Sequence, residues 1–511
     1  MSSDARRWWA LGALVPVALA LNLDATVLSL ALPTLARALH ASTAQLQWFV
    51  SGYLLVFAAA MVPGGMLGDR FGRKRLLLVA LAIFALGSLA CAYATSPGAF
   101  IAARLLLGLG AALATPLTLG VLPVLFGEEE RKKALAIVMA ATMLGYPLGP
   151  ILGGWLLSSF WWGWVFLINL PVVAIAAAAV IMLLPESRSS ERPRIDGAGV
   201  ALSSAGLALV SYGVIEAGQQ GWGSAAAVGG IVAGALMLAG FVAWERRARE
   251  PLLDPRLFAI RGFTIGTLLS AVVSFALIGL FFAVPLYFQE VIGTGPMGSG
   301  LRLLPMIGGL LAGAGAAVKL AERVGATVVV AAGFVLVAAG LALGATTGLG
   351  SGSGFAAAWV AVVGLGTGFA MPTTMDAALG ALSPNQAGVG SGTIQALRMV
   401  GGSFGAAILG SILNAAYRGR LDLTGVPAAA AHAARDSVAA GTAAAGRLGS
   451  PALLHTVQTA YVHGLDVMLL VSAAVAAVGV PLTLAFLPRQ APRRSDDTVE
   501  TQQGAPGELL T

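Results

Sequence analysis

The feature that most constrains this sequence is a long apolar segment that recurs from one end of the chain to the other. A membrane-spanning helix needs about 20 mostly apolar residues, and fourteen such stretches can be counted among the 511 residues. Charged residues make up 10% of the chain, compared with about 25% in soluble proteins. The pattern predicts an all-α membrane protein and excludes a soluble or a disordered one. The segments span 9–35, 46–67, 76–95, 99–126, 134–158, 163–184, 197–217, 224–244, 263–288, 299–318, 326–347, 354–376, 390–415 and 462–487.

The positions of the basic residues predict how these segments cross the membrane. Cytoplasmic loops are rich in Lys and Arg. With a cytoplasmic N-terminus, 22 of the 30 bases fall on the cytoplasmic side and five on the outer side, and both termini are cytoplasmic. This orientation accounts for the net charge of +7, which therefore does not indicate a nucleic-acid partner. The first segment stays apolar as far as Pro33, which is too long for a cleaved secretory signal.

The number of segments also narrows the class of protein. Fourteen spans without a large soluble domain are typical of a transporter or channel and not of an enzyme. None of the four lysines follows a glycine, so the chain lacks the Gly-Lys phosphate loop of an ATP-driven pump, and an ion gradient is the expected energy source. A single cysteine, Cys91, and four histidines form no recognisable metal-binding pattern. We therefore expect neither a metal nor a cofactor.

The most distinctive local sequence is GGMLGDRFGRKRLL, at residues 64–77. Its spaced glycines allow a tight turn between two helices. A carboxylate and several bases stand where the first of these helices should end. A simple positive-inside anchor would explain the bases, but it would not explain the glycine spacing or the embedded Asp69-Arg70 pair.

This loop resembles the signature loop of the major facilitator superfamily, with Gly68 where the family prefers Ala. The resemblance implies a loop that latches two halves of the protein together on the cytoplasmic side, with its carboxylate facing a helix end of the other half. A degenerate second copy at 318–326 fits the internal repeat of such transporters. The gating residues implied here are Gly65, Asp69, Arg70, Gly72, Arg73 and Lys74.

The resemblance also implies a division of the chain into two six-helix halves and two inserted helices. We expect the first half at 1–184, the inserted transmembrane pair with its linkers at 185–261, and the second half at 262–487. Within the second half, 416–461 is expected to be a long extracellular loop. The polar segment 488–511 has the composition of a disordered cytoplasmic tail.

Two charges inside the predicted membrane helices are candidates for ion coupling. Asp24 lies about 22 Å along the first segment at ~1.5 Å per residue, where a carboxylate costs on the order of 3 kcal/mol unless it is paired or hydrated. Arg104 falls at a similar depth in the fourth segment, so we expect the two to interact directly or through water. A proton can compete with the guanidinium for the carboxylate, which would make a proton switch. A structural ion pair or a protonated Asp24 is the alternative.

Three further segments narrow the resemblance to the fourteen-span drug:proton antiporter branch of this superfamily, the EmrB/QacA-like transporters. LDATVLSLALP at 23–33, which contains Asp24, resembles a signature of that branch. RLLLGLGAALATP at 104–116, which begins with Arg104, resembles the basic motif of proton-coupled members of the superfamily. GYPLGPILGG at 145–154 resembles the antiporter motif that marks exporters.

The physical basis of this third motif is its small residues and its prolines. Small residues four apart let helices pack closely, and prolines bend a helix. Ordinary close packing would explain any single glycine, whereas the family uses the whole string as an interface between the halves. The residues concerned are Gly145, Gly149, Pro150, Gly153 and Gly154.

Other charges in the segments are less decisive. Asp376 ends the twelfth segment and Arg398 lies in the thirteenth, so they could form a second acidic site, pair with each other or contact substrate. A solvated helix-end Asp376 fits equally well. Glu216, Glu290 and Asp466 fall near outer ends of segments, where we expect them to be interfacial.

Together, the residues and the resemblance predict a proton-coupled antiporter that exports hydrophobic or amphipathic drug-like compounds across the cytoplasmic membrane of a bacterium. Its partners would be the substrate, protons and membrane lipids, and it would function as a monomer. A dedicated exporter of one metabolite, antibiotic, lipid or siderophore is the alternative. The glycine-proline string argues against a third reading, a proton-coupled importer.

Overall fold

The computed structural model describes residues 3–188, 196–248, 251–253, 255–383 and 386–487. These residues form helices and connecting turns, and no β-strand occurs among them. The expected all-α class is therefore confirmed. The segment 488–511, expected to be a disordered tail, lies outside the described residues.

Long helices occupy residues 3–184, called the first half below, where the sequence predicts its first six segments. Gly72 separates two of them with a φ of 111°, a value that glycine adopts readily, so the turn between these helices is tight. The helices are α1 (Ser3–Ala38), α2 (Thr43–Phe71), α3 (Arg73–Ala92), α4 (Pro97–Gly120), α5 (Leu122–Leu125), α6 (Glu128–Ser159), α7 (Trp164–Leu167) and α8 (Asn169–Leu183).

The rest of the chain continues as helices in the same manner. Two of its elements, η2 and η3, are single π-helical turns that extend longer helices. The elements are α9 (Gly197–Gln220), α10 (Ala225–Glu245), η1 (Leu257–Ala259), α11 (Arg261–Leu286), η2 (Tyr287–Val291), α12 (Pro296–Val324), α13 (Ala326–Gly344), α14 (Ser353–Gly380), α15 (Ala387–Phe404), η3 (Gly405–Leu409), α16 (Gly410–Arg420), α17 (Ala428–Asp436), α18 (Val438–Leu448) and α19 (Pro451–Phe486). Residues 262–487 are called the second half below.

Thirteen helices or runs of helices in the described part are long and apolar enough to cross a membrane. The remaining predicted segment, 134–158, lies within α6, a helix of 32 residues. Some spans are built from more than one element: α7 and α8 form the run Trp164–Leu183, and α15, η3 and α16 form the run Ala387–Arg420. The chain is thus a multi-pass membrane protein.

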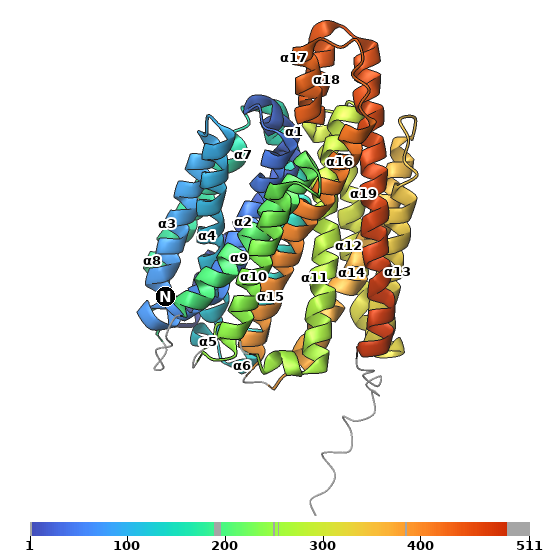
Figure 1. Cartoon of the computed structure of the whole chain (residues 1–511). Helices are drawn as coiled ribbons and strands as arrows, with labels where there is room; N and C mark the ends of the chain where they lie inside the picture. Colours follow the sequence, from blue (N-terminus) through green and yellow to red (C-terminus); the bar gives the residue numbers. More distant parts are fainter. Residues whose placement is uncertain (1–2, 189–195, 249–250, 254, 384–385, 488–511) are drawn as a thin grey trace, which may run out of the picture.

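The segment 416–461, expected to be a long extracellular loop, contains helices. α16 continues to Arg420, α17 and α18 fill most of the middle, and α19 begins at Pro451. Figure 1 shows α17 and α18 beyond the end of the bundle opposite to the one where α19 finishes. The reason is local, because the segment is rich in alanine, the residue that most favours helix. Its helices α17 and α18 are too short to span a membrane.

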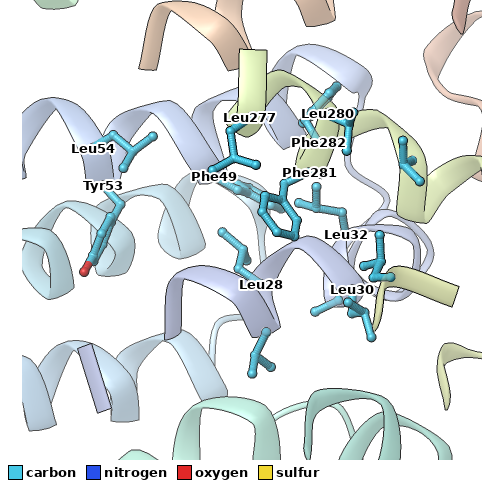
Figure 2. Packing of buried hydrophobic residues seen from close by; sticks show 14 of the residues in the cluster. Leu28, Leu30, Leu32, Phe49, Tyr53, Leu54, Leu277, Leu280, Phe281 and Phe282 are labelled. Atoms are coloured by element: carbon cyan, nitrogen blue, oxygen red, sulfur yellow. The ribbon is translucent and has the colours of Figure 1, made fainter. Parts of the chain in front are cut away.

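The core where the two halves meet is built from α1, α2 and α11. Figure 2 shows Leu28 of α1, Phe49 of α2 and Phe281 of α11 gathered between these three helices. Leu28 and Phe49 are 2% and 0% exposed, so water is excluded from this junction. Burying such side chains contributes roughly 1.5–3 kcal/mol each.

The helices α9 and α10, expected to be an inserted pair, pack against each other. α9 also contacts α2 of the first half and α16 of the second half. Asn414 of α16 donates to the Gly218 carbonyl 2.8 Å away. The pair is therefore attached to the bundle through α9 and does not form a separate domain.

Polar contacts between the two halves gather toward the end of the bundle that carries α17 and α18. Gln47 of α2 donates to the Ala407 carbonyl of η3 at 2.9 Å. The Ser51 hydroxyl donates to the Ser403 carbonyl at 3.2 Å. Among the described residues, every hydrogen bond or ion pair that joins the halves lies toward this end: Leu30–Gln289, Arg37–Glu290, Thr43–Asp436, Gln47–Ala406, Gln47–Ala407, Gln47–Ser411, Ser51–Ser403 and Ser158–Met297.

Candidate functional site

Asp24 and Arg104 form a buried ion pair in the middle of the first half. Nη1 of Arg104 donates to Oδ2 of Asp24 at 2.7 Å, and each side chain is 1% exposed. The expectation that these two residues interact is therefore confirmed, and the contact is direct. Because a buried charge is tolerated only when it is paired, each of the two residues requires the other.

Further contacts from α2 hold Arg104 in place. Its Nε donates to the Phe49 carbonyl at 3.0 Å. Its guanidinium carbon lies 4.4 Å from the centre of the Tyr53 ring, a cation–π contact. Arg104 thus has three kinds of partner, whereas Asp24, among the described residues, is hydrogen-bonded and ion-paired to Arg104 alone.

The close approach of α2 and α3 to α4 depends on glycine. A Cβ at Gly108 would lie 2.7 Å from the Tyr53 carbonyl oxygen, and a Cβ at Gly110 would lie 2.6 Å from the backbone nitrogen of Phe84. Neither distance leaves room for a side chain. The sequence after Arg104 therefore brings α4 within reach of α2, which supplies the carbonyl and the ring that hold the guanidinium.

This arrangement can act as a proton switch. Asp24 is satisfied as an anion while Arg104 is paired with it. A proton on Asp24 removes the ion pair but leaves Arg104 its carbonyl and ring partners, so the guanidinium stays in place. The side chain that gains freedom on protonation is therefore Asp24, on α1.

The loop between α2 and α3 is organised by Arg73. Its Nε and Nη2 contact Oδ1 of Asp69 at 2.9 and 2.8 Å, and its Nη1 donates to the Gly120 carbonyl at the end of α4 at 2.7 Å. Arg70 is exposed and stacks on Phe71. The loop thus ties three helix ends together, those of α2, α3 and α4.

A second set of contacts joins this loop to the segment after α8. Lys74 donates its Nζ to the Ile181 carbonyl at 2.7 Å and its backbone N–H to Glu186 Oε1 at 3.2 Å. The Arg73 backbone N–H donates to the Ser187 carbonyl at 2.9 Å. Sequence reasoning missed Glu186, although an acidic residue near three bases in a predicted cytoplasmic linker was a usable signal.

The expected contact of this loop with the other half is not found. Among the described residues, the hydrogen bonds and ion pairs of Asp69 and Arg73 end at residues of the first half and of the segment directly after it. The reason is geometric: the Asp69 carboxylate near the end of α2 is occupied by Arg73, the first residue of α3, across the turn at Gly72. The loop braces α2, α3, α4 and α8 in this conformation.

This bracing predicts unequal effects of two substitutions on stability. Arg73→Gln loses a charged hydrogen bond to a helix-end carbonyl, a contact of about 1.5–3 kcal/mol. Asp69→Asn loses only a partly exposed ion pair, which contributes about 0–1 kcal/mol. We expect Arg73→Gln to lower the melting temperature of the purified protein clearly more than Asp69→Asn. Arg75→Gln is the control, since Arg75 is 73% exposed and should change nothing measurable.

The glycine string of α6 lies against α1 close to Asp24. A Cβ at Gly145 would lie 2.8 Å from the Cβ of Asn22, and a Cβ at Gly149 would overlap Thr26. A Cβ at Gly153 would lie 2.8 Å from a methyl group of Val27. Three glycines spaced four residues apart therefore form one smooth face on which α1 rests.

The same string also contacts the second half. A Cβ at Gly154 would lie 2.9 Å from the Cα of Met297, and a Cβ at Gly300 of α12 would overlap the Pro150 carbonyl. The expected interface between the halves is thus present, and it joins α6 to α12. The string differs from the expectation in having a second face, the one that packs on α1.

Comparison with known families identifies the fold described above. The sequence profile of the Major Facilitator Superfamily matches residues 14–406. The chain belongs to the major facilitator superfamily. A member of this family is a membrane transporter and not an enzyme.

Relatives of this major facilitator protein include drug and antibiotic exporters of actinobacteria. The Tetracenomycin C resistance and export protein of Streptomyces glaucescens is 35% identical over 409 residues, which cover 80% of this chain and 76% of that protein. The Multidrug efflux pump LfrA of Mycolicibacterium smegmatis is 34% identical over 493 residues, which cover 93% and 96%.

Solved structures of distant family members share the fold. A bacterial homologue of the human lysosomal transporter Spinster, 17% identical, superposes with a TM-score of 0.66 over 95% of this chain and 99% of that one. The human organic anion transporter MFSD10 is 16% identical, with a TM-score of 0.58 over 94% and 100%.

Asp376 and Arg398 are not brought together in this transporter. Asp376 on α14 is exposed, and no ion pair joins it to Arg398 in the described part of the chain. Arg398 on α15 is partly buried, and it donates to Gln395 on its own helix and approaches the Met371 sulfur of α14 at 3.7 Å. Of the alternatives left open by the sequence, direct pairing of the two residues is therefore not seen in this conformation.

Two side chains at the junction of the halves were misjudged or missed from the sequence. Glu290, expected to be interfacial, is 6% exposed and sits in the π-turn η2. Gln47 is 0% exposed and donates to two carbonyls of η3. A π-turn leaves no mark in the hydrophobic pattern, so the burial of Glu290 could not be predicted from its place in the segment.

Proposed function

We propose that this transporter exports hydrophobic or amphipathic drug-like compounds across the cytoplasmic membrane in exchange for protons. The observation that carries the proposal is the buried pair of Asp24 and Arg104, which lies in the membrane-spanning part of α1 and α4. An ionisable residue within a membrane span marks an ion pathway by default. The named exporters among the relatives support the direction and the class of substrate.

The contacts of α1 suggest how a proton on Asp24 would change the conformation. α1 carries Asp24 and, next to it, Asn22 and Thr26, which rest on the glycines of α6. α6 in turn meets α12 of the second half at Gly154. Loss of the Asp24–Arg104 pair would loosen α1 from α4. Because α1 rests on α6, a movement of α1 would be transmitted through α6 to the interface of the halves.

The orientation of the basic residues and the position of the polar contacts support an inward-facing state. If both termini are cytoplasmic, α17 and α18 lie outside the cell. The polar contacts between the halves then lie toward the outer end, while the described residues of the cytoplasmic end provide none. The loop at 65–74 would close the cytoplasmic end in the opposite state, when the second half approaches it.

Arg398 is a candidate substrate contact in the second half. It lies in the span formed by α15, η3 and α16 and is partly buried. Its neighbours Gln395 and Met371 provide one amide and one thioether, a mixed polar and apolar surface that suits an amphipathic compound. Asp376, being exposed near the end of α14, is the weaker candidate for a second acidic site.

A drug-susceptibility panel tests the proposed substrate class. The chain is expressed in a bacterium that lacks its own efflux pumps, and its protection against structurally unrelated hydrophobic drugs is compared with that of an empty vector. We expect the inhibitory concentration to rise for several drugs, and the rise to disappear when a protonophore collapses the proton gradient. Unchanged values for every drug would contradict multidrug export.

A dedicated exporter of one compound is the second candidate. It is favoured by the names of two relatives, the Tetracenomycin C resistance and export protein and the probable actinorhodin transporter. The same panel separates the two candidates, because a dedicated exporter would protect against a single compound and its close analogues.

We also propose that the transporter works as a monomer with lipid around its outer helices. Large apolar side chains on α10, such as Leu236 at 68% exposed, suit contact with lipid chains.

A further inference from the structure

Glu290 is a buried carboxylate at the junction of the two halves. It belongs to η2, a single π-turn that continues α11, and π-turns are frequent at functional sites. Its side chain is 4% exposed, although glutamate is seldom buried unless it is paired. It takes no part in the proposed proton switch at Asp24.

Two side chains from other elements face this carboxylate. The Thr442 hydroxyl of α18 donates to Oε2. Nη2 of Arg37, at the end of α1, lies 3.8 Å from Oε1, which accepts no hydrogen bond among the described residues. Tyr461 of α19 also lies close enough to interact with the charge, but its hydroxyl donates to the Ala283 carbonyl instead.

Among the described residues, the charge on Glu290 is therefore compensated by side chains of α1 and α18, the two elements that cover it. Arg37 belongs to the first half, whereas Glu290 and Thr442 both belong to the second half, with Thr442 on the external helix α18. If α1 moves away from η2, water can reach the carboxylate and replace both partners. If this end of the bundle closes without Arg37 and Thr442 in place, the ionised carboxylate of Glu290 is buried unpaired, which is strongly unfavourable.

We propose that Glu290 makes closure of the outer end conditional on Arg37 and Thr442 being in place. The charge penalises any closed arrangement in which α1 or α18 is misplaced, and so it couples the external helices α17 and α18 to the gate between the halves. This end is the outer one if both termini are cytoplasmic, as in the proposed function. The inferred coupling itself does not depend on what is transported.

The test measures how often this end is open. Cys91, the one cysteine of the chain, is replaced by alanine, and spin labels are attached at Thr95→Cys and Gly350→Cys. Both positions are exposed, one between α3 and α4 and the other between α13 and α14. Pulsed electron paramagnetic resonance in lipid nanodiscs then gives the ratio of long to short distances.

Thr442→Val removes the donor and nearly preserves the shape of the side chain. We expect it to raise the ratio of open to closed molecules roughly fivefold to a hundredfold, since a buried acceptor loses its partner. Adding Glu290→Gln should return the ratio to near the wild-type value, because the uncompensated charge is gone. Thr424→Val is the matched control: this exposed hydroxyl of the same external segment bonds only Asp422 and should shift nothing.

Arg37→Gln gives a second and independent arm, which serves if the Thr442 variant fails to fold. It should also raise the open fraction, and Glu290→Gln should again reverse the change. The inference is overturned if neither single variant shifts the distances, or if Glu290→Gln fails to reverse the shifts. Because the readout is a distance, failure here is separate from failure of drug export in the susceptibility panel.

Discussion

Asp24→Asn is expected to abolish proton-driven export and to destabilise the protein as well. Asparagine keeps the shape of the side chain but can neither bind nor release a proton. It also leaves Arg104 as a buried cation without its carboxylate, which costs about 3–5 kcal/mol. Drug resistance should fall to the level of the empty vector, and the melting temperature of the purified protein should drop.

The double variant Asp24→Asn/Arg104→Gln separates these two effects. It removes both buried charges together, so most of the lost stability should return. Resistance should stay at the level of the empty vector, because the proton site is still missing. Recovery of resistance along with stability would mean that the pair is structural and that the proton is carried elsewhere.

Gly149→Ala is the second substitution with a large expected effect. A Cβ at this position would overlap Thr26 and lie 2.8 Å from its Cβ, so α6 and α1 must move apart. Overpacking of this kind costs about 1–3 kcal/mol, and it acts on the helix that carries Asp24. We expect the protein to be made and inserted but to confer little or no resistance.

Two further variants identify the cause of that loss. Gly12→Ala adds the same methyl group to α1 where no atom lies within 4 Å, so resistance should be unchanged. Thr26→Ala removes the overlapping hydroxyl and should partly restore the resistance of the Gly149→Ala variant. If Gly149→Ala proves as active as the wild type, the glycine face is not needed for transport.

The sequence predicts some of these features better than others for physical reasons. The contact of Asp24 with Arg104 could be predicted because helical rise gives the depth of each charge, and an unpaired charge in hydrocarbon is costly. The close packing of α6 could be predicted from the spacing of its small residues, whereas its contact with the other half was implied by the resemblance to the antiporter motif. The depth of a charge and the spacing of small residues can both be obtained from the sequence of a single helix.

Features that depend on a local break or on a long-range contact could not be predicted in this way. The burial of Glu290 follows from a π-turn and from a cover formed by α18, more than 150 residues later. The resemblance implies that the Asp69 carboxylate faces the second half, but Arg73 at the start of α3 occupies it. The helices α17 and α18 are too short to appear as membrane spans in the hydrophobic pattern, although their alanine content favours helix.

The most direct test of the central claim is drug accumulation in proteoliposomes that hold a pH gradient. The drug is one against which the susceptibility panel finds protection. With an acidic lumen, wild-type protein should concentrate the drug inside, and it should not do so when the pH is equal on both sides. The Asp24→Asn/Arg104→Gln variant should exchange labelled for unlabelled drug but concentrate none. Accumulation by this variant equal to that of the wild type would contradict the assignment of Asp24 as the proton site.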